Sequence, residues 1–214
     1  MNIKDCLLEK IQDQPFLIEG INEKLINVSA LARKLKPEIE ELMGSTIKEN
    51  AIIMALNRLE IKEFHSIKKE FKRAAKELGD ITVRSGIIDC TIKNEVNNDI
   101  KINKIITSVK GSFSSFSKGI NETTIIVNNE HKQTLLSILS KNEITSIVED
   151  LSAITIHLPK GNSSIPGLYY FLLGKMAWRG ISLIELISTT NEFTMILKNR
   201  DIGKALETLM ELKS

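Results

Sequence analysis

The clearest candidate for a binding site in this chain is a short loop that ends in proline and glycine. The loop lies directly before an apolar helix-forming segment. The loop reads Ile165-Pro166-Gly167, and the segment begins Leu168-Tyr169. The first N–H groups of a helix have no acceptor inside the helix, so they are free to bind a carboxylate or a phosphate. The pattern therefore predicts an anion site here. The alternative is a tight strand-to-helix connection whose surroundings are filled by side chains.

Residue types that perform catalysis are present, but without the spacing that catalysis needs. His65, His131 and His157 have no cysteine or carboxylate at metal-ligand spacing. The sequence contains no serine elbow, phosphate-binding glycine loop or supported pair of carboxylates. We expect no enzymatic activity, no catalytic residue, no metal and no cofactor.

Composition sets mild limits. The chain has 214 residues, with 29 Lys and Arg against 27 Asp and Glu, so its total charge indicates neither nucleic acid nor an anionic membrane. Its two cysteines, Cys6 and Cys90, form no disulfide framework. The most apolar stretch, residues 165–187, is interrupted by Lys175 and Arg179. We expect a cytoplasmic protein that does not enter a membrane.

Residues 1–59 have the pattern of a helical domain. Apolar residues recur at helical spacing, and a break is expected at Lys36-Pro37. The phrase Val28-Ser29-Ala30-Leu31-Ala32-Arg33, with a later helix ending near Leu59, resembles the helix-turn-helix of small prokaryotic regulators. This resemblance makes Arg33, Asn57 and Arg58 candidate DNA contacts. The region carries eight basic and nine acidic residues, which is close to balance.

Residues 60–79 predict an amphipathic linker helix with a basic outer face. Between Arg58 and Lys76 there are seven basic and three acidic residues, and apolar residues recur every three or four positions. The ordinary interpretation is a solvated face above a packed stripe. The alternative is a nucleic-acid contact through four cations of this helix, Lys68, Lys69, Lys72 and Arg73.

From residue 80 the period changes to that of strands, and the pattern then repeats. Residues 80–150 read strand, helix, strand, strand, helix, strand, the order of the ferredoxin-like fold. The segment that begins Asn121-Glu122-Thr123 precedes the similar segment Asn191-Glu192-Phe193 by 70 residues. Residues 151–214 therefore form a second copy. The predicted fold is α+β, with an N-terminal helical domain followed by two ferredoxin-like βαββαβ modules.

The second copy resembles an ACT domain, most closely the regulatory ACT repeats of aspartate kinases. Gly180-Ile181-Ser182 stands where those repeats have Gly-Ile-Asn, and Thr190-Asn191-Glu192 stands where they have Ser-Ser-Glu. Ser182 thus replaces the asparagine that commonly holds the ligand in this family. The resemblance implies an amino-acid site between ACT modules, lined by Ile165, Pro166, Gly167, Leu168 and Tyr169 and by Ser182, Leu183, Ile184 and Glu185 of a facing module.

Three functional hypotheses follow. The first is a non-catalytic, amino-acid-responsive allosteric regulator, a homodimer in which ligand binding is coupled to the N-terminal helices. The second is a separate regulatory subunit that docks on an enzyme of amino-acid biosynthesis. The third is a DNA-binding transcriptional regulator.

Overall fold

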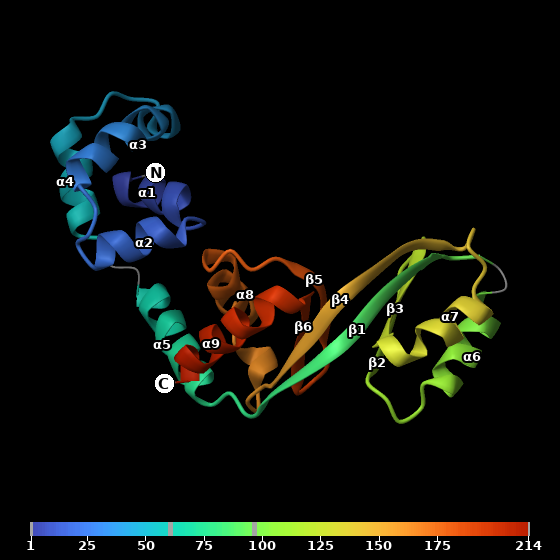
Figure 1. Cartoon of the computed structure of the whole chain (residues 1–214). Helices are drawn as coiled ribbons and strands as arrows, with labels where there is room; N and C mark the ends of the chain where they lie inside the picture. Colours follow the sequence, from blue (N-terminus) through green and yellow to red (C-terminus); the bar gives the residue numbers. More distant parts are fainter. Residues whose placement is uncertain (1, 60–61, 96–97, 214) are drawn as a thin grey trace. The chain divides into compact units, whose positions relative to one another are not determined.

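A computed structural model describes residues 2–59, 62–95 and 98–213, and the chain divides into two compact units (Figure 1). The helical unit is Met1–Glu70 and the sheet unit is Phe71–Ser214. Helix α5 (Lys62–Lys76) runs across the boundary between them. Residues 60 and 61 and the side chains of residues 62–68 lie outside the described part. The side chains of the predicted basic helix are therefore described only from residue 69 onward.

Within residues 2–59 the chain forms four helices around one apolar core. Asn2 caps the first helix, where its side chain accepts a hydrogen bond of 2.9 Å from the N–H of Asp5. Asn27 caps the third in the same way through Ala30. The helices are α1 (Ile3–Ile11), α2 (Pro15–Asn22), α3 (Val28–Met43) and α4 (Glu49–Asn57). The buried core consists mainly of Cys6, Leu7, Ile11, Leu31, Leu35, Ile39, Ile52 and Leu56.

The predicted break at Lys36-Pro37 is wrong, because α3 continues through Pro37 to Met43. Proline removes one backbone hydrogen bond from a helix interior and strains the preceding turn. Leu35 and Ile39, on either side of it, are both buried, so core packing offsets that cost. The chain turns only after α3, where Gly44 adopts a left-handed conformation (φ 64°).

The described part of the sheet unit holds a single six-stranded antiparallel sheet in the order β2-β3-β1-β4-β6-β5. This agrees with the ferredoxin-like, mixed α and β fold expected from the sequence. The strands are β1 (Ile81–Lys93), β2 (Ser114–Lys118), β3 (Glu122–Asn128), β4 (Ile144–His157), β5 (Leu183–Ser188) and β6 (Glu192–Lys198). The helices are α6 (Asn98–Ser108), α7 (Lys132–Ile138), α8 (Leu168–Trp178) and α9 (Ile202–Lys213), with short 3-10 turns at Asn129–His131, Asn162–Ser164 and Asn199–Asp201.

Hydrogen bonds repeat at the 70-residue offset seen in the sequence. The N–H of Gly119 donates to the carbonyl of Glu122 over 2.8 Å, and the N–H of Thr189 donates to Glu192 over 2.9 Å. The turns that join β2 to β3 and β5 to β6 are therefore built alike. Each half of the sheet also has a cross-strand pair of threonine hydroxyls, Thr91 with Thr124 (3.3 Å) and Thr155 with Thr194 (2.8 Å), although only Thr124 and Thr194 are 70 residues apart.

Strand β4 is longer than the sequence predicts, and both β1 and β4 run through the two halves of the sheet. The sequence predicts separate strands at residues 144–148 and 153–158, whereas β4 is continuous. The first half of β1 pairs with the second half of β4, so the first residues of the first copy, 81–85, complete the sheet beside the second copy. Register shifts in this ladder accompany Gly86 (φ 68°) and Asp150 (φ 61°), both in the left-handed conformation.

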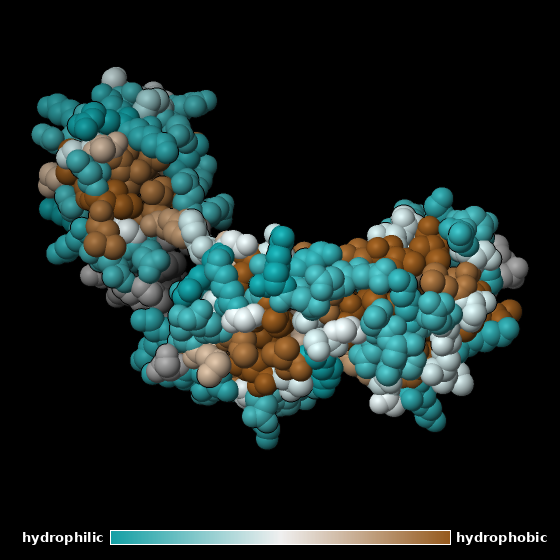
Figure 2. All heavy atoms as spheres, in the orientation of Figure 1, coloured by the Kyte–Doolittle hydropathy of each residue, from teal (hydrophilic) through white to brown (hydrophobic). Residues whose placement is uncertain are grey.

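The two faces of the sheet are covered differently. Ile88 packs in one core with α6 and α7, and Ile154 packs in another with α8 and α9. Their neighbours Ile87 and Ala153 point to the other face, because side chains alternate along a strand. There they form a third cluster that also contains Ile126, Leu151 and Ile196, with Phe113, Val148, Ile184 and Ile187 packed against it. On the visible face of each unit, hydrophobic side chains gather among hydrophilic ones (Figure 2).

Asp89 is a buried carboxylic acid on the face that carries this third cluster. Its side chain is 4% exposed and accepts a hydrogen bond of 3.4 Å from the hydroxyl of Thr91. Burial, followed by the negative charge of Glu185 on β5, raises the pKa of Asp89 from 3.8 to about 6.

This carboxyl should make stability depend on pH. The folded state holds the Asp89 proton more tightly than the unfolded chain, so its stabilising effect is present below pH 3.8 and is lost as the pH rises through about 6. Asp89→Asn should therefore raise the free energy of unfolding at pH 8 by about 1–2 kcal/mol and change it much less at pH 3.5. Urea unfolding at both pH values measures the difference. Asp80→Asn, at an exposed position, is the control. An equal effect of Asp89→Asn at both pH values would contradict the prediction.

Candidate functional site

The loop between β4 and α8 is held in place by one buried side chain. Asn162 is 8% exposed, and its Nδ2 donates to the carbonyls of Pro159 (3.1 Å) and Thr190 (2.8 Å). The N–H of Leu158 donates to the carbonyl of Asn191 over 2.7 Å. These bonds fasten the loop to the turn between β5 and β6, so the approach to α8 has a fixed starting point.

The N-terminus of α8 has the open arrangement that the sequence predicts. Gly167 is its N-cap residue with φ 77°, a conformation that favours glycine, and no side chain caps the helix. The N–H of Leu168 makes a long bond of 3.3 Å to the carbonyl of Ile165. Pro166, Gly167 and Tyr169 are exposed, while Leu168 is buried. The first turn is therefore reachable from solvent, with backbone donors at its end.

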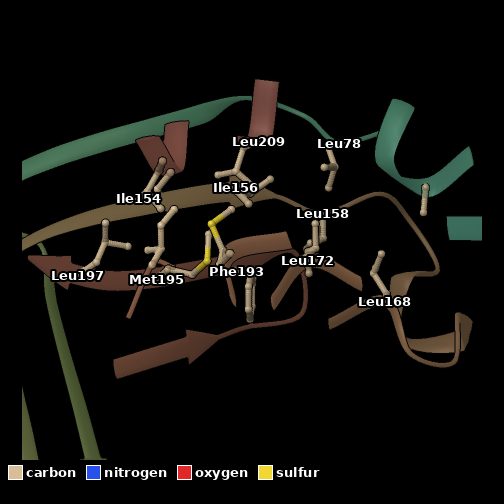
Figure 3. Close-up of a cluster of buried hydrophobic side chains, with 14 residues drawn as sticks. Leu78, Ile154, Ile156, Leu158, Leu168, Leu172, Phe193, Met195, Leu197 and Leu209 are labelled. Atoms are coloured by element: carbon tan, nitrogen blue, oxygen red, sulfur yellow. The ribbon is translucent and has the colours of Figure 1, made fainter. Parts of the chain in front are cut away.

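Helix α8 is anchored on the sheet through one face. Leu168 and Leu172 lie in the core cluster together with Leu158, Phe193 and Leu78 (Figure 3). These residues come from α8, from the position directly after β4, from β6 and from the segment after α5, so the start of α8 is fixed by packing from several elements.

Tyr169 connects the first turn of α8 to the end of β5. Its hydroxyl lies 2.8 Å from the hydroxyl oxygen of Ser188, and its ring stacks on Phe193 with 4.9 Å between centroids. Ser182 instead follows Gly180 at the C-terminal end of α8. Within one chain, the two halves of the predicted ligand site therefore lie at opposite ends of this helix.

The four residues predicted to face the ligand from β5 and the residue before it point in different directions. Leu183 packs against the core under α8 and α9, whereas Ile184 packs against the cluster on the other face. A register shift between Leu183 and Glu185 separates them. Glu185 influences Asp89 on that other face, and Ser182 is exposed. Ser182 is thus the one of the four that is open to solvent, and the site as a whole stays a prediction.

Two of the predicted nucleic-acid contacts pair with carboxylates. Arg33 of α3 pairs with Glu49 of α4 over 3.3 Å, and Arg73 pairs with Glu77 one turn further along over 3.8 Å. Both guanidinium groups are thereby partly neutralised. The remaining candidates are Asn57, Arg58, Lys69 and Lys72, which are exposed, and Lys68, whose side chain lies outside the described residues.

Within residues 2–59, 62–95 and 98–213, no group of three or more His, Cys, Asp or Glu side chains could hold a metal ion. Both cysteines are buried, and burial followed by the nearby Asp89 carboxylate raises the pKa of the Cys90 thiol to about 11. Such a thiol stays protonated and is a poor nucleophile.

The described helices contain none that is both long and apolar enough to span a membrane.

Comparisons with known proteins give a fold and no sequence family. No family model matches the chain, and no curated protein sequence matches it. The ligand-free regulatory subunit of aspartate kinase from Thermus thermophilus matches with a TM-score of 0.54 and 12% identity, over 64% of this chain and 99% of that subunit. A structure of aspartokinase alpha and beta subunits matches with a TM-score of 0.52 and 11% identity, over 63% of this chain and 97% of the other.

The aspartate kinase of Clostridium acetobutylicum matches with a TM-score of 0.53 and 12% identity, over 63% of this chain but only 34% of the kinase, so this chain spans about a third of the enzyme it matches. At these identities the likeness is one of fold. The resemblance to aspartate kinase regulatory regions is confirmed at that level, and the helix-turn-helix resemblance is not confirmed.

Sequence reasoning missed two parts of this region. The Asn162 bonds and the contact of Tyr169 with Ser188 join residues that are far apart in the chain. A polar residue in a loop next to a glycine was the available signal for Asn162, and it does not specify a partner.

Removing the Asn162 side chain should release the loop. Asn162→Ala deletes two hydrogen bonds of a buried group and should lower the free energy of unfolding of the sheet unit by about 1–2 kcal/mol. Amide exchange of residues 160–167 should rise more than exchange elsewhere. Hydrogen-exchange mass spectrometry measures this, with Ser163→Ala at an exposed neighbouring position as the control. Unchanged exchange in the loop would show that Asn162 does not hold it.

Proposed function

We propose that this protein is a non-catalytic regulator that binds an amino acid and transmits that binding to its N-terminal helices. The open first turn of α8, on a fold like that of aspartate kinase regulatory subunits, is the observation that supports the proposal. The match to the Thermus thermophilus subunit runs over 99% of it, so the likeness is to a regulatory region and not to a catalytic one.

The chemistry of the first turn fits an α-carboxylate. The backbone N–H of Tyr169 attracts negative charge, the N–H of Leu168 is held only by its long bond of 3.3 Å to the carbonyl of Ile165, and the helix dipole adds to the attraction. An α-amino group needs acceptors, which carbonyl groups and the Ser182 hydroxyl of a second module supply. A serine at this position has a shorter reach than the asparagine of the related repeats, so we expect a different effector preference.

A second copy of the chain completes this site. Tyr169 and Ser182 belong to opposite ends of α8, so one chain presents each half to solvent separately. Within each chain, strand β5 lies at the edge of the described sheet, in the half formed by the second ferredoxin-like module. Edge strands pair readily with another chain, and a two-fold dimer would place each Ser182 opposite a first turn of α8 in its partner.

A second candidate function is that of a separate regulatory subunit docked on an enzyme of amino-acid biosynthesis. This candidate is favoured by the match to a regulatory subunit of aspartate kinase, 99% of which is covered, and by the match to a structure of aspartokinase alpha and beta subunits, of which 97% of the matched chain is covered. Docking would use the helical unit, and mixing the chain with a purified catalytic subunit of aspartate kinase tests it by size-exclusion chromatography. Separate elution at micromolar concentrations would count against this candidate.

A thermal-shift screen of the twenty amino acids tests the main proposal. An effector that binds the folded chain must raise its melting temperature, and a ligand at one hundred times its Kd stabilises by about 2.7 kcal/mol. We expect one amino acid, or a small related group, to give a shift at millimolar concentration. Ser182→Ala should reduce that shift without lowering the melting temperature of the free protein, because Ser182 is exposed.

Ser146→Ala, at an exposed serine of β4 outside the predicted site, is the matched control and should leave the shift unchanged. If no amino acid shifts the melting temperature, the proposal of an amino-acid sensor fails. A shift that Ser182→Ala leaves intact would place the ligand elsewhere.

A further inference from the structure

We propose that the ring of Phe71 couples the loop at Pro166 and Gly167 to helix α5, and so links the candidate ligand site to the segment that leads to the helical unit. That the coupling responds to a bound amino acid rests on the proposed function. The contact between Phe71 and the loop can be tested without any ligand. Phe71 is the first residue of the sheet unit, and α5 begins nine residues earlier at Lys62.

Phe71 contacts the first turn of α8 at both of its ends. A Cβ placed on Gly167 would lie 3.0 Å from Cζ and 3.6 Å from Cε1 of the Phe71 ring. The same ring stacks on Phe171, with 5.3 Å between centroids and 26° between planes. The N–H of Phe171 donates to the carbonyl of Gly167 over 2.9 Å, which closes that first turn. A change in the conformation of this first turn would therefore move the Phe71 ring.

The other end of α5 is held firmly. Ala74 and Leu78 are buried, with exposures of 1% and 3%, in the core that includes Leu168. Beyond the helix, the N–H of Gly79 donates to the carbonyl of His157 over 2.8 Å, and Nζ of Lys213 donates to the carbonyl of Gly79 over 2.7 Å. Phe71 lies five residues before Lys76, the last residue of α5, a separation of roughly 7.5 Å along the helix.

Helix α5 is thus fixed beyond its C-terminal end and contacts the first turn of α8 through Phe71. A displacement of the Phe71 ring cannot be absorbed by sliding the helix along its axis, because Gly79 is fixed to β4 and α9. It is absorbed by tilting α5 about that fixed end. A carboxylate bound to the N–H of Tyr169 at the start of α8 orders the first turn and its Phe171 ring, and thereby selects one position of Phe71 and of α5.

Two glycines of the same loop give a matched test. Gly161 and Gly167 are both exposed and have nearly the same backbone conformation, with φ of 76° and 77°. Alanine strains the backbone equally at either position. A Cβ at Gly161 meets nothing within 4 Å, whereas a Cβ at Gly167 presses on Phe71. The difference between Gly161→Ala and Gly167→Ala therefore isolates contact with the ring from backbone strain.

Hydrogen-exchange mass spectrometry of the full chain without ligand is the measurement. We expect Gly167→Ala to raise exchange in residues 69–78 roughly fivefold or more, and Gly161→Ala to leave it unchanged. Adding Phe71→Leu to Gly167→Ala shortens the side chain and should restore most of the protection. Circular dichroism shows that each variant is folded, and Phe71→Leu alone supplies the reference for the double variant.

The outcomes separate this inference from the proposed function. Equal exchange in α5 for the two alanine variants, or no rescue by Phe71→Leu, overturns the coupling whether or not an amino acid binds. If the amino-acid screen yields no ligand while the glycine pair behaves as expected, the coupling stands and the sensor proposal fails. If a ligand is found, it should change exchange in residues 69–78 of the wild-type chain and not of Phe71→Ala, although both bind it.

Discussion

The sheet unit depends on one constraint, the continuous pairing of β1 with β4 past two residues in the left-handed conformation. Gly86 and Asp150 let the ladder shift register without separating the strands. Polar contacts hold the bend from both sides. Nζ of Lys132 donates to both carboxylate oxygens of Glu149 over 2.7 Å, and Nζ of Lys198 donates to the Glu149 carbonyl over 3.1 Å. Lys132 begins α7 and Lys198 ends β6, so each half of the sheet contributes a bond to the same short segment.

Because β4 is continuous, its direction in the second half of the sheet is fixed. The starting point of the loop before α8 is therefore fixed as well. Leu158 is buried directly after β4, and Asn162 attaches the next few residues to the turn between β5 and β6. Only then does the chain reach Gly167 and start α8. The free N–H groups of that helix are thus positioned by a rigid sheet and not by the exposed loop alone, which is the condition for a selective site.

Local pattern was enough to predict much of this fold from the sequence. Period and turn chemistry gave the order of strands and helices, and the offset between Asn121 and Asn191 gave the repeat. Three features escaped, each for a physical reason. Pro37 lies inside a helix because burial of Leu35 and Ile39 outweighs a local rule. The joining of residues 144–148 to 153–158 depends on pairing with β1, which periodicity does not report. The ring of Phe71 meets Gly167 across 96 residues of sequence, and no local signal marks such a contact.

Coupling through Phe71 would act in both directions. If an occupied first turn of α8 favours one position of α5, then anything that holds α5 in that position must strengthen ligand binding by the same factor. The stiffness of the link sets the size of the factor. Phe71 acts through ring contacts, which are short-ranged and lose much of their energy within an ångström of separation. A coupling of this kind passes between two discrete arrangements and does not vary smoothly. It also gives Gly167 a role beyond its backbone conformation, because a Cβ at that position would lie 3.0 Å from Cζ of the Phe71 ring.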